Sequence, residues 1–175
     1  MEKTQPEVIR QYFEQLGQNI PMKLHLDIAG AVSLILPGYI ERSTGDIDVV
    51  GEIPAEIRSM HKLLDDLEAL HGLHLGHIQT NYFPAGWSDR VHSFGLYRRL
   101  EVSLLDVYDV FMSKLFSARI KDLGDLKVLA PQLEKVKLVE RFKSNCGGFV
   151  VVDRLKELAN NNWRILFAED LPAMQ

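Results

Sequence analysis

The sequence has a single cysteine, no long hydrophobic run and no N-terminal signal pattern. Cys146 cannot form an intramolecular disulfide on its own, which fits the reducing environment of the cytosol. No apolar run reaches the ~18 residues of a membrane-spanning helix, and the first residues do not pass from basic to apolar as a signal peptide does. We therefore expect a cytoplasmic protein with no membrane partner.

Two glycine-rich phosphate motifs are also missing, the P-loop and the Gly-x-Gly-x-x-Gly fingerprint, which disfavours the folds that use them. A net charge of −4 argues against non-specific coating of nucleic acid or anionic lipid, although a local basic patch stays open. With 175 residues, 46% of them hydrophobic, the chain can bury a core. We expect one domain over residues 1–130 and a helical extension over residues 131–175 packed on it.

The apolar pattern indicates an α/β fold. Residues 24–29, 46–51 and 99–105 are short apolar or alternating segments of the kind that form strands. Ahead of them, Thr4 and Glu7 have the spacing of a capping box, which predicts a helix from there to Pro21. We expect a small mixed sheet covered by helices, followed by a helical C-terminal part.

Asp46 and Asp48 are the residues that point most directly to chemistry. Residues two apart in a strand project from the same face, so both carboxylates should point one way while Ile47 and Val49 enter a core. Two carboxylates that close repel each other unless a cation or a proton lies between them. Magnesium is commonly held by one or two carboxylates together with substrate phosphates. The two acids could equally be unrelated residues on a polar strand face.

Three residues before the Asp pair are candidates for binding phosphate. Gly30 has no Cβ, so the backbone can approach a ligand closely, and the helix after it would aim free N–H groups at that ligand. Gly30 could also serve only a tight turn from strand to helix. Arg42 could meet a phosphate or pair with a neighbouring acid, and Thr44 could touch a substrate or fix the loop.

These residues resemble a family signature, which is Gly-Gly or Gly-Ser at a helix start and then Arg-x-Thr-x-Asp-x-Asp before a strand. Here it reads Gly30-Ala31 and then Arg42-Ser43-Thr44-Gly45-Asp46-Ile47-Asp48, so Ala31 departs from the usual second residue. A second block, from Lys114 to Leu126, looks like the Lys-x-x-x-Ala-x-Arg-x-x-Asp-x-x-Asp helix of the same families. Over residues 24–133 the chain is similar to the nucleotidyltransferase-fold superfamily of DNA polymerase β, including the minimal nucleotidyltransferases and the AbiEii-like bacterial proteins.

The resemblance implies that residues 1–130 form a nucleotidyltransferase-like domain. Such a domain transfers a nucleoside monophosphate from a nucleoside triphosphate to an acceptor, here RNA, a protein or a small molecule. Mg²⁺ or Mn²⁺ would bind Asp46 and Asp48. The nucleotide would contact residues of both blocks, namely Gly30, Ala31, Arg42, Thr44, Lys114, Arg119 and Asp122. Arg119 and Asp122 would organise Lys114 and the phosphate pocket, or they could form only a surface ion pair at helical spacing. Lys114 lies along an apolar helix stripe, so it either extends to solvent or reaches into the active site, and the resemblance favours the second.

Glu101 is the predicted third carboxylate of the catalytic set, because families of this type place a third acid on a later strand. It is the only acid in the middle of the strand over residues 99–105, whereas Asp106 at the strand's end is better explained as a helix cap. We predict that the Glu101 side chain lies on the same side of the sheet as Asp46 and Asp48. The alternative function is a catalytically degenerate binding module of this fold, or a toxin–antitoxin component with a protein partner. A purely structural interaction protein would bind no nucleotide.

Overall fold

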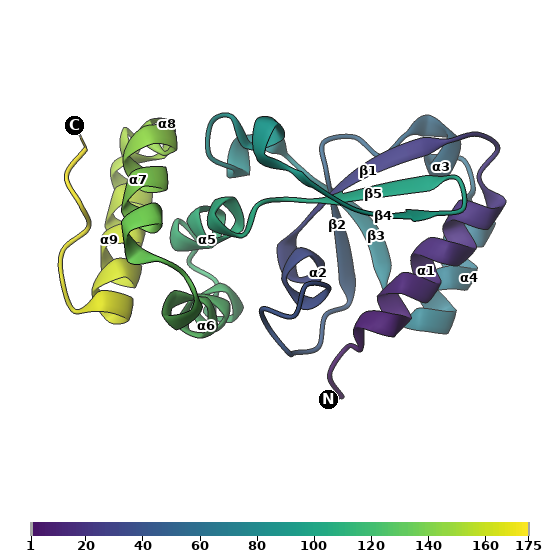
Figure 1. Cartoon of the computed structure of the whole chain (residues 1–175), viewed down its shortest axis with the longest axis horizontal. Helices are drawn as coiled ribbons and strands as arrows, with labels where there is room; N and C mark the ends of the chain where they lie inside the picture. The colour runs from purple at the N-terminus through teal and green to yellow at the C-terminus, as the bar shows by residue number, and fades with distance from the viewer. Residues whose placement is uncertain (1, 175) are drawn as a thin grey trace. The chain divides into compact units, whose positions relative to one another are not determined.

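The computed structural model describes residues 2–174, whose contacts divide the chain into two compact units. The first unit is Met1–Thr80 with Val91–Leu105, and the second is Asn81–Arg90 with Asp106–Gln175. The expected α/β fold with a small mixed sheet is confirmed (Figure 1). The contacts group α5 (Val107–Leu115) and α6 (Ile120–Leu129) with the C-terminal helices. The division into domains at residue 130 stays a prediction.

The first unit is built around a five-stranded sheet of order β3-β2-β1-β5-β4. Its strands are β1 (Leu24–Ala29), β2 (Asp46–Val50), β3 (His74–Ile78), β4 (His92–Tyr97) and β5 (Leu100–Leu104). Its helices are α1 (Pro6–Asn19), α2 (Gly30–Ile35), α3 (Ala55–Arg58) and α4 (His61–His71). The central strand β1 pairs antiparallel with β2 and parallel with β5, while β3 runs parallel to β2 and β4 antiparallel to β5.

The two faces of this sheet differ in polarity. Ile28 is aligned with Val49 on one side and with Leu104 on the other, and all three are buried on one face. Helix α1 packs on that face so closely that a Cβ on Gly17 would lie 1.8 Å from the carbonyl oxygen of Tyr97. Helix α4 lies beside α1 (Figure 1). The side chains that alternate with the buried ones therefore form a polar face on the other side of the sheet.

The start of α1 differs from the prediction. Gln5 is the N-cap residue and makes no side-chain cap bond, so the capping box at Thr4 is wrong. Pro6 begins the helix, where the missing N–H of proline has no cost. The Thr4 hydroxyl oxygen instead accepts a hydrogen bond from the Thr44 amide (2.9 Å) and donates one to the Thr44 carbonyl (3.1 Å). The chain ahead of α1 is thereby fastened to the loop that precedes the Asp pair.

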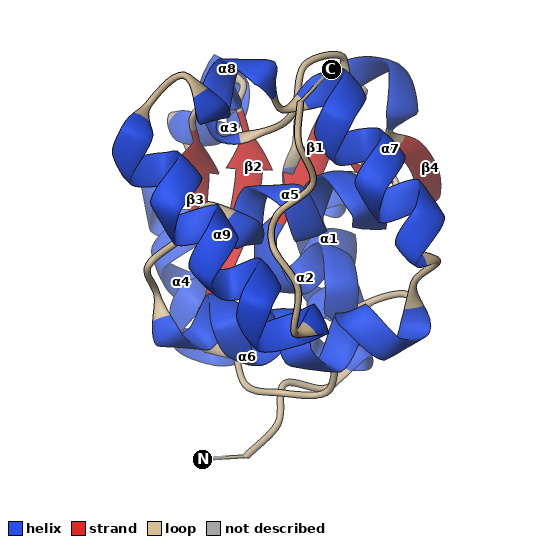
Figure 2. Cartoon of the chain, turned by 90° about the vertical axis from the view of Figure 1, so that its left-hand side faces the viewer, coloured by secondary structure: helices blue, strands red, loops and turns tan. Residues whose placement is uncertain are grey.

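The second unit is helical. Besides α5 and α6 it contains α7 (Lys135–Asn145), α8 (Gly147–Val150) and α9 (Asp153–Phe167), which are blue in Figure 2. Its core includes the fully buried side chains of Phe111, Phe142 and Trp163. Asp106 caps α5 as predicted, since its Oδ1 accepts a hydrogen bond from the Tyr108 amide (3.0 Å). Across residues 2–174, no helix has the length and apolar character needed to cross a membrane.

Candidate functional site

Asp46 and Asp48 begin β2 and lie on the polar face of the sheet. Asp46 is exposed and Asp48 is half-buried, whereas Ile47 and Val49 between and after them are buried on the apolar face. The strand alternation places the two Cα atoms about 6.6 Å apart along one face, from two residues at ~3.3 Å each. Two carboxylates at this separation can meet at one cation.

Gly30 lies directly against Asp48. It leaves β1 with a φ of 64° and begins α2, and a Cβ at this position would lie 2.1 Å from Asp48 Oδ2. Position 30 therefore needs glycine both for its left-handed backbone and for the space that Asp48 occupies. Ala31, which was predicted to bind nucleotide, is 6% exposed and belongs to the buried side of α2. The sequence suggested that a ligand approaches the backbone at Gly30; in the structure the group against Gly30 is the Asp48 carboxylate, and contact with a ligand stays a prediction.

The loop before β2 is shaped by its own hydrogen bonds. The Thr44 hydroxyl lies 3.3 Å from the Asp46 amide, from which it accepts, and Thr44 also pairs through its backbone with Thr4. Arg42 is half-buried, and its Nη1 donates to the carbonyl of Ser43 (2.8 Å). Thr44 thus stabilises the turn that places Asp46 at the start of β2. Contact of Thr44 or Arg42 with a substrate stays a prediction.

Glu101 shares the polar face but lies far along it. Both acids can be referred to their partners on β1, because Asp48 of β2 is aligned with Ala29 and Glu101 of β5 is aligned with His25. Four residues of strand therefore separate Glu101 from Asp48, about 13 Å at ~3.3 Å per residue. Its carboxylate lies 3.5 Å from Lys23 Nζ and 4.0 Å from His25 Nδ1. The face was predicted correctly, but the distance removes Glu101 as a third ligand for a cation on the Asp pair.

Lys114, in the second unit, is held between two carboxylates. Its Nζ lies 2.6 Å from Asp122 Oδ1 and 2.9 Å from Asp125 Oδ2, and the lysine is 7% exposed. The four-residue break between α5 and α6 brings α6 back beside α5, which is how an acid eight residues later reaches Lys114. Arg119, the N-cap residue of α6, is mostly exposed and touches Asp122 only at 3.8 Å. The second motif therefore forms a buried ion network.

Asp122 is held in its ionised form by this network. Burial raises the pKa of the Asp122 carboxyl, but the Lys114 ammonium outweighs it, together with hydrogen bonds from Lys114 and Ser117, so the pKa lies below its usual range. The Ser117 hydroxyl donates to Asp122 Oδ2 (2.6 Å), so both carboxylate oxygens are engaged. The positive charge of Lys114 is consequently balanced within the protein.

Comparison with known protein families assigns the chain to one of them. Residues 8–159 match the model of a family described as "Nucleotidyltransferase of unknown function (DUF6036)". The chain belongs to this nucleotidyltransferase family. No curated protein and no solved structure matches it.

In this member of the nucleotidyltransferase family, the sequence interpretation missed Asp27. It lies two residues before Ala29 on β1, hence on the polar face and diagonal to Asp48, about 7–8 Å away between Cα atoms. Asp27 Oδ1 is 2.8 Å from His25 Nε2. The signal in the sequence was an acid inside an otherwise apolar strand, Leu24 to Ala29.

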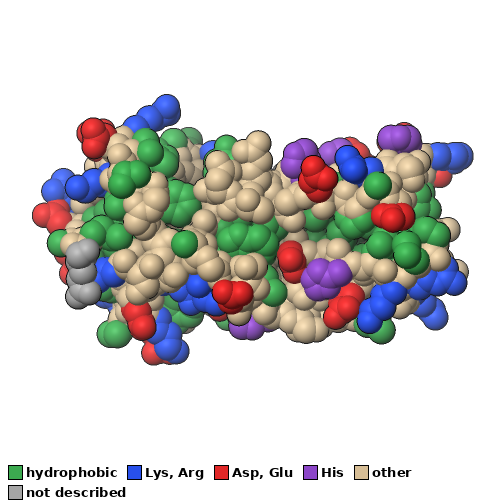
Figure 3. All heavy atoms as spheres, turned by 90° about the horizontal axis from the view of Figure 1, so that it is seen from above, with side chains coloured by type: hydrophobic (Ala, Val, Ile, Leu, Met, Phe, Trp, Pro, Cys, Tyr) green, Lys and Arg blue, Asp and Glu red, His purple; other side chains and the backbone are tan. Residues whose placement is uncertain are grey.

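All six histidines belong to the first unit, and Figure 3 shows histidine side chains exposed beside acidic ones.

Proposed function

We propose that this nucleotidyltransferase-family protein transfers a nucleoside monophosphate from a nucleoside triphosphate to an acceptor, with Mg²⁺ or Mn²⁺ held by Asp46 and Asp48. The observation that carries the proposal is the placement of both carboxylates on one sheet face, with Asp48 against the side-chain-free Gly30. Family membership supports the reaction class.

The donor set fits a hard divalent cation. Magnesium needs only one or two carboxylates when substrate phosphates and water supply its other ligands. Within residues 2–174, no group of three or more His, Cys, Asp or Glu side chains is arranged to hold a metal. The cation therefore depends on the triphosphate for its remaining ligands, so we expect the metal and the nucleotide to bind together.

The residues around the Asp pair have separate tasks in this proposal. Asp46 and Asp48 hold the cation and so fix the triphosphate against the polar face of the sheet. When bound, the cation neutralises charge that develops on the transferring phosphoryl group. Arg42 contributes positive charge to the triphosphate, and Thr44 holds the loop that positions Asp46. Lys114 is left out of the phosphate contacts, because it is buried and its ammonium group already lies against both Asp122 and Asp125.

Calorimetry tests the cation site. Wild-type protein is titrated with a nonhydrolysable triphosphate in the presence and absence of Mn²⁺, and we expect binding that needs the metal. Asp46→Asn combined with Asp48→Asn should abolish it. The matched control is Asp65→Asn with Asp66→Asn, which removes two exposed aspartates from α4 of the same unit. Equal binding by the Asp46/Asp48 variant and the control would refute the proposal.

A second candidate function is a catalytically degenerate binding module, or a toxin–antitoxin component with a protein partner. The distance of Glu101 from the Asp pair favours it, because a two-metal mechanism needs cations ~3.5–4 Å apart and further ligands near both. This candidate predicts metal-dependent triphosphate binding without transfer. A screen with labelled nucleoside triphosphates against RNA, protein and small-molecule acceptors separates the two functions and identifies the acceptor.

A further inference from the structure

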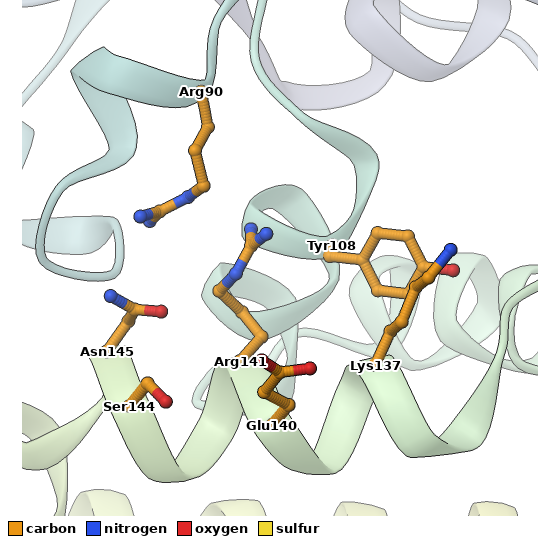
Figure 4. A pocket seen from close by; sticks show the side chains of 7 residues that line it. All are labelled: Arg90, Tyr108, Lys137, Glu140, Arg141, Ser144 and Asn145. Atoms are coloured by element: carbon orange, nitrogen blue, oxygen red, sulfur yellow. The ribbon is translucent and has the colours of Figure 1, made fainter.

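The second unit contains a cavity whose lining residues are not part of the proposed cation site. Its volume is about 300 Å³, and it lies between the loop ending at Arg90, the start of α5 and one side of α7 (Figure 4). Arg90 and Arg141 point toward each other across it, with the ring of Tyr108 beside Arg141. This volume is at the lower end of the range for small-molecule sites.

The two arginines are fixed by one buried carboxylate. Asp109, which is fully buried, accepts hydrogen bonds from Arg90 Nε (2.8 Å) and Nη2 (2.9 Å) and from Arg141 Nη1 (2.6 Å). Asp106 accepts a further bond from Arg141 Nη1 (3.0 Å). The guanidinium groups are therefore held in place before any ligand arrives, which lowers the entropic cost of binding.

Both guanidinium groups keep unused donors. A guanidinium carries five N–H donors in a planar fork. Among the hydrogen bonds of residues 2–174, Arg90 Nη1 and Arg141 Nε and Nη2 have no acceptor. Arg141 also lies over the Tyr108 ring, 6.0 Å from its centroid, which supports the plane of the fork. The free Nε–Nη2 edge of Arg141 can bind two phosphate oxygens as a fork, whereas Arg90 offers Nη1 alone, because its own Nε–Nη2 edge is used on Asp109.

The rest of the lining suits a phosphate group. Ser144 supplies a hydroxyl and Asn145 an amide whose Nδ2 uses one bond on the Ala85 carbonyl (3.0 Å). Lys137 adds a third cation, paired at the exposed rim with Glu134 (2.6 Å). Glu140 is the single acid of the lining. Donors thus come from the loop and from α7, as the several oxygens of a phosphate require, whereas a carboxylate would use fewer of them.

We propose that this cavity binds a small phosphate monoester, with the phosphate group against Arg90 and Arg141. The cavity consists only of residues of the second unit and shares none with the proposed cation site, so the proposal does not depend on nucleotidyl transfer. The volume admits a phosphate with a small attached group and excludes a whole nucleoside triphosphate.

The experiment is calorimetric titration of the full chain with inorganic phosphate and with glycerol 3-phosphate, in a buffer without phosphate or divalent cations. We expect both to bind, the monoester more tightly, and acetate to bind far more weakly. Arg141→Lys keeps the charge but loses the fork, so it should weaken binding by about tenfold or more. No phosphate binding by the wild type, or acetate binding as tight as phosphate, would overturn the proposal.

Glu140→Gln gives a readout that a merely structural role would not change. Removing the one acid of the lining should strengthen phosphate binding several-fold, because a like charge beside the anion disappears. Glu157→Gln is the matched control, since it removes an exposed acid of α9 outside the lining and should leave the affinity unchanged. An equal effect of the two substitutions would place phosphate binding elsewhere and refute the site. Unfolding in urea, followed for each variant, shows whether the second unit remains folded.

Discussion

Replacing Lys114 by Met is the sharpest test of how the second unit is held together. Methionine keeps much of the volume of the lysine stem and removes the ammonium group that lies against Asp122 (7% exposed) and Asp125 (3% exposed). Removing one partner of a buried ion pair costs ~3–5 kcal/mol, because the remaining charge is buried and unpaired. A domain of ordinary stability has ~5–15 kcal/mol to lose. We therefore expect a large fall in the urea midpoint.

Tryptophan fluorescence is the assay, since both tryptophans, Trp87 and Trp163, belong to the second unit. Lys121→Met on the exposed side of α6 is the control for the substitution itself and should change stability by less than ~0.5 kcal/mol. Adding Asp125→Asn to Lys114→Met should restore part of the loss, because it removes one of the two buried carboxylates that Lys114 contacts.

The dependence on pH gives a second check. The wild-type Asp122 has a lowered pKa, so its contribution to stability is present above the unfolded value of ~3.9 and is lost as the pH falls through the folded value. In Lys114→Met, burial is no longer offset by the Lys114 ammonium and raises the pKa of the same carboxyl, so the variant gains stability as the pH falls. The difference between the two proteins should therefore shrink on acidification. A difference below ~1 kcal/mol at neutral pH, or one that does not vary with pH, would refute the ion network as a source of stability.

Three further predictions follow from single positions. Gly30→Ala should abolish metal-dependent triphosphate binding, because the new Cβ would displace Asp48, and its left-handed backbone should cost ~1–2 kcal/mol of stability. Gly38→Ala is the control: its φ is 87° and nothing lies near its Cβ, so it should lower stability without affecting binding. Equal loss of binding in both variants would contradict the role of Asp48. Tyr12→Phe should leave stability unchanged or raise it by ~1 kcal/mol in thermal melts, because the fully buried hydroxyl has no hydrogen-bond partner within residues 2–174. A marked loss of stability would show that the hydroxyl does form a hydrogen bond. Burial, and after it the Asp109 carboxylate, raises the pKa of the Cys146 thiol to about 12. At pH 8 the native protein should therefore react with a disulfide reagent about a thousandfold more slowly than the protein unfolded in urea. Rapid labelling of the native protein would show instead that the thiol is accessible.

Local pattern was enough to predict the central strands and the shared face of Asp46 and Asp48. β1 was predicted from a short apolar segment, and β2 because Asp46 and Asp48 alternate there with Ile47 and Val49. The two edge strands were missed. β3 contains two histidines and a glycine, which have little strand preference of their own, and it forms because β2 offers a partner on that side.

The contacts that decide the candidate site depend on long-range register, which local patterns do not contain. Alternation gave the correct face for Glu101, but only the alignment of β1 with β2 and β5 shows that it lies four residues away from Asp48. For a similar reason the sequence left two interpretations of Asp122, as an organiser of Lys114 or as one half of a surface ion pair with Arg119. Helical spacing joins residues three or four apart, whereas Asp122 and Asp125 reach Lys114 across the break between two helices.

The position of β1 at the centre of the sheet governs the order in which the first unit can fold. Its parallel partner is β5, so that Leu24 aligns with Leu100, and the segment between them includes the loop that belongs to the second unit. Pairs so distant along the chain form slowly, because a long loop must close first. During synthesis, β1 therefore waits with one edge unpaired until β5 has left the ribosome, and an unpaired edge can recruit strands of other chains. A fragment that stops before β5 should accordingly aggregate.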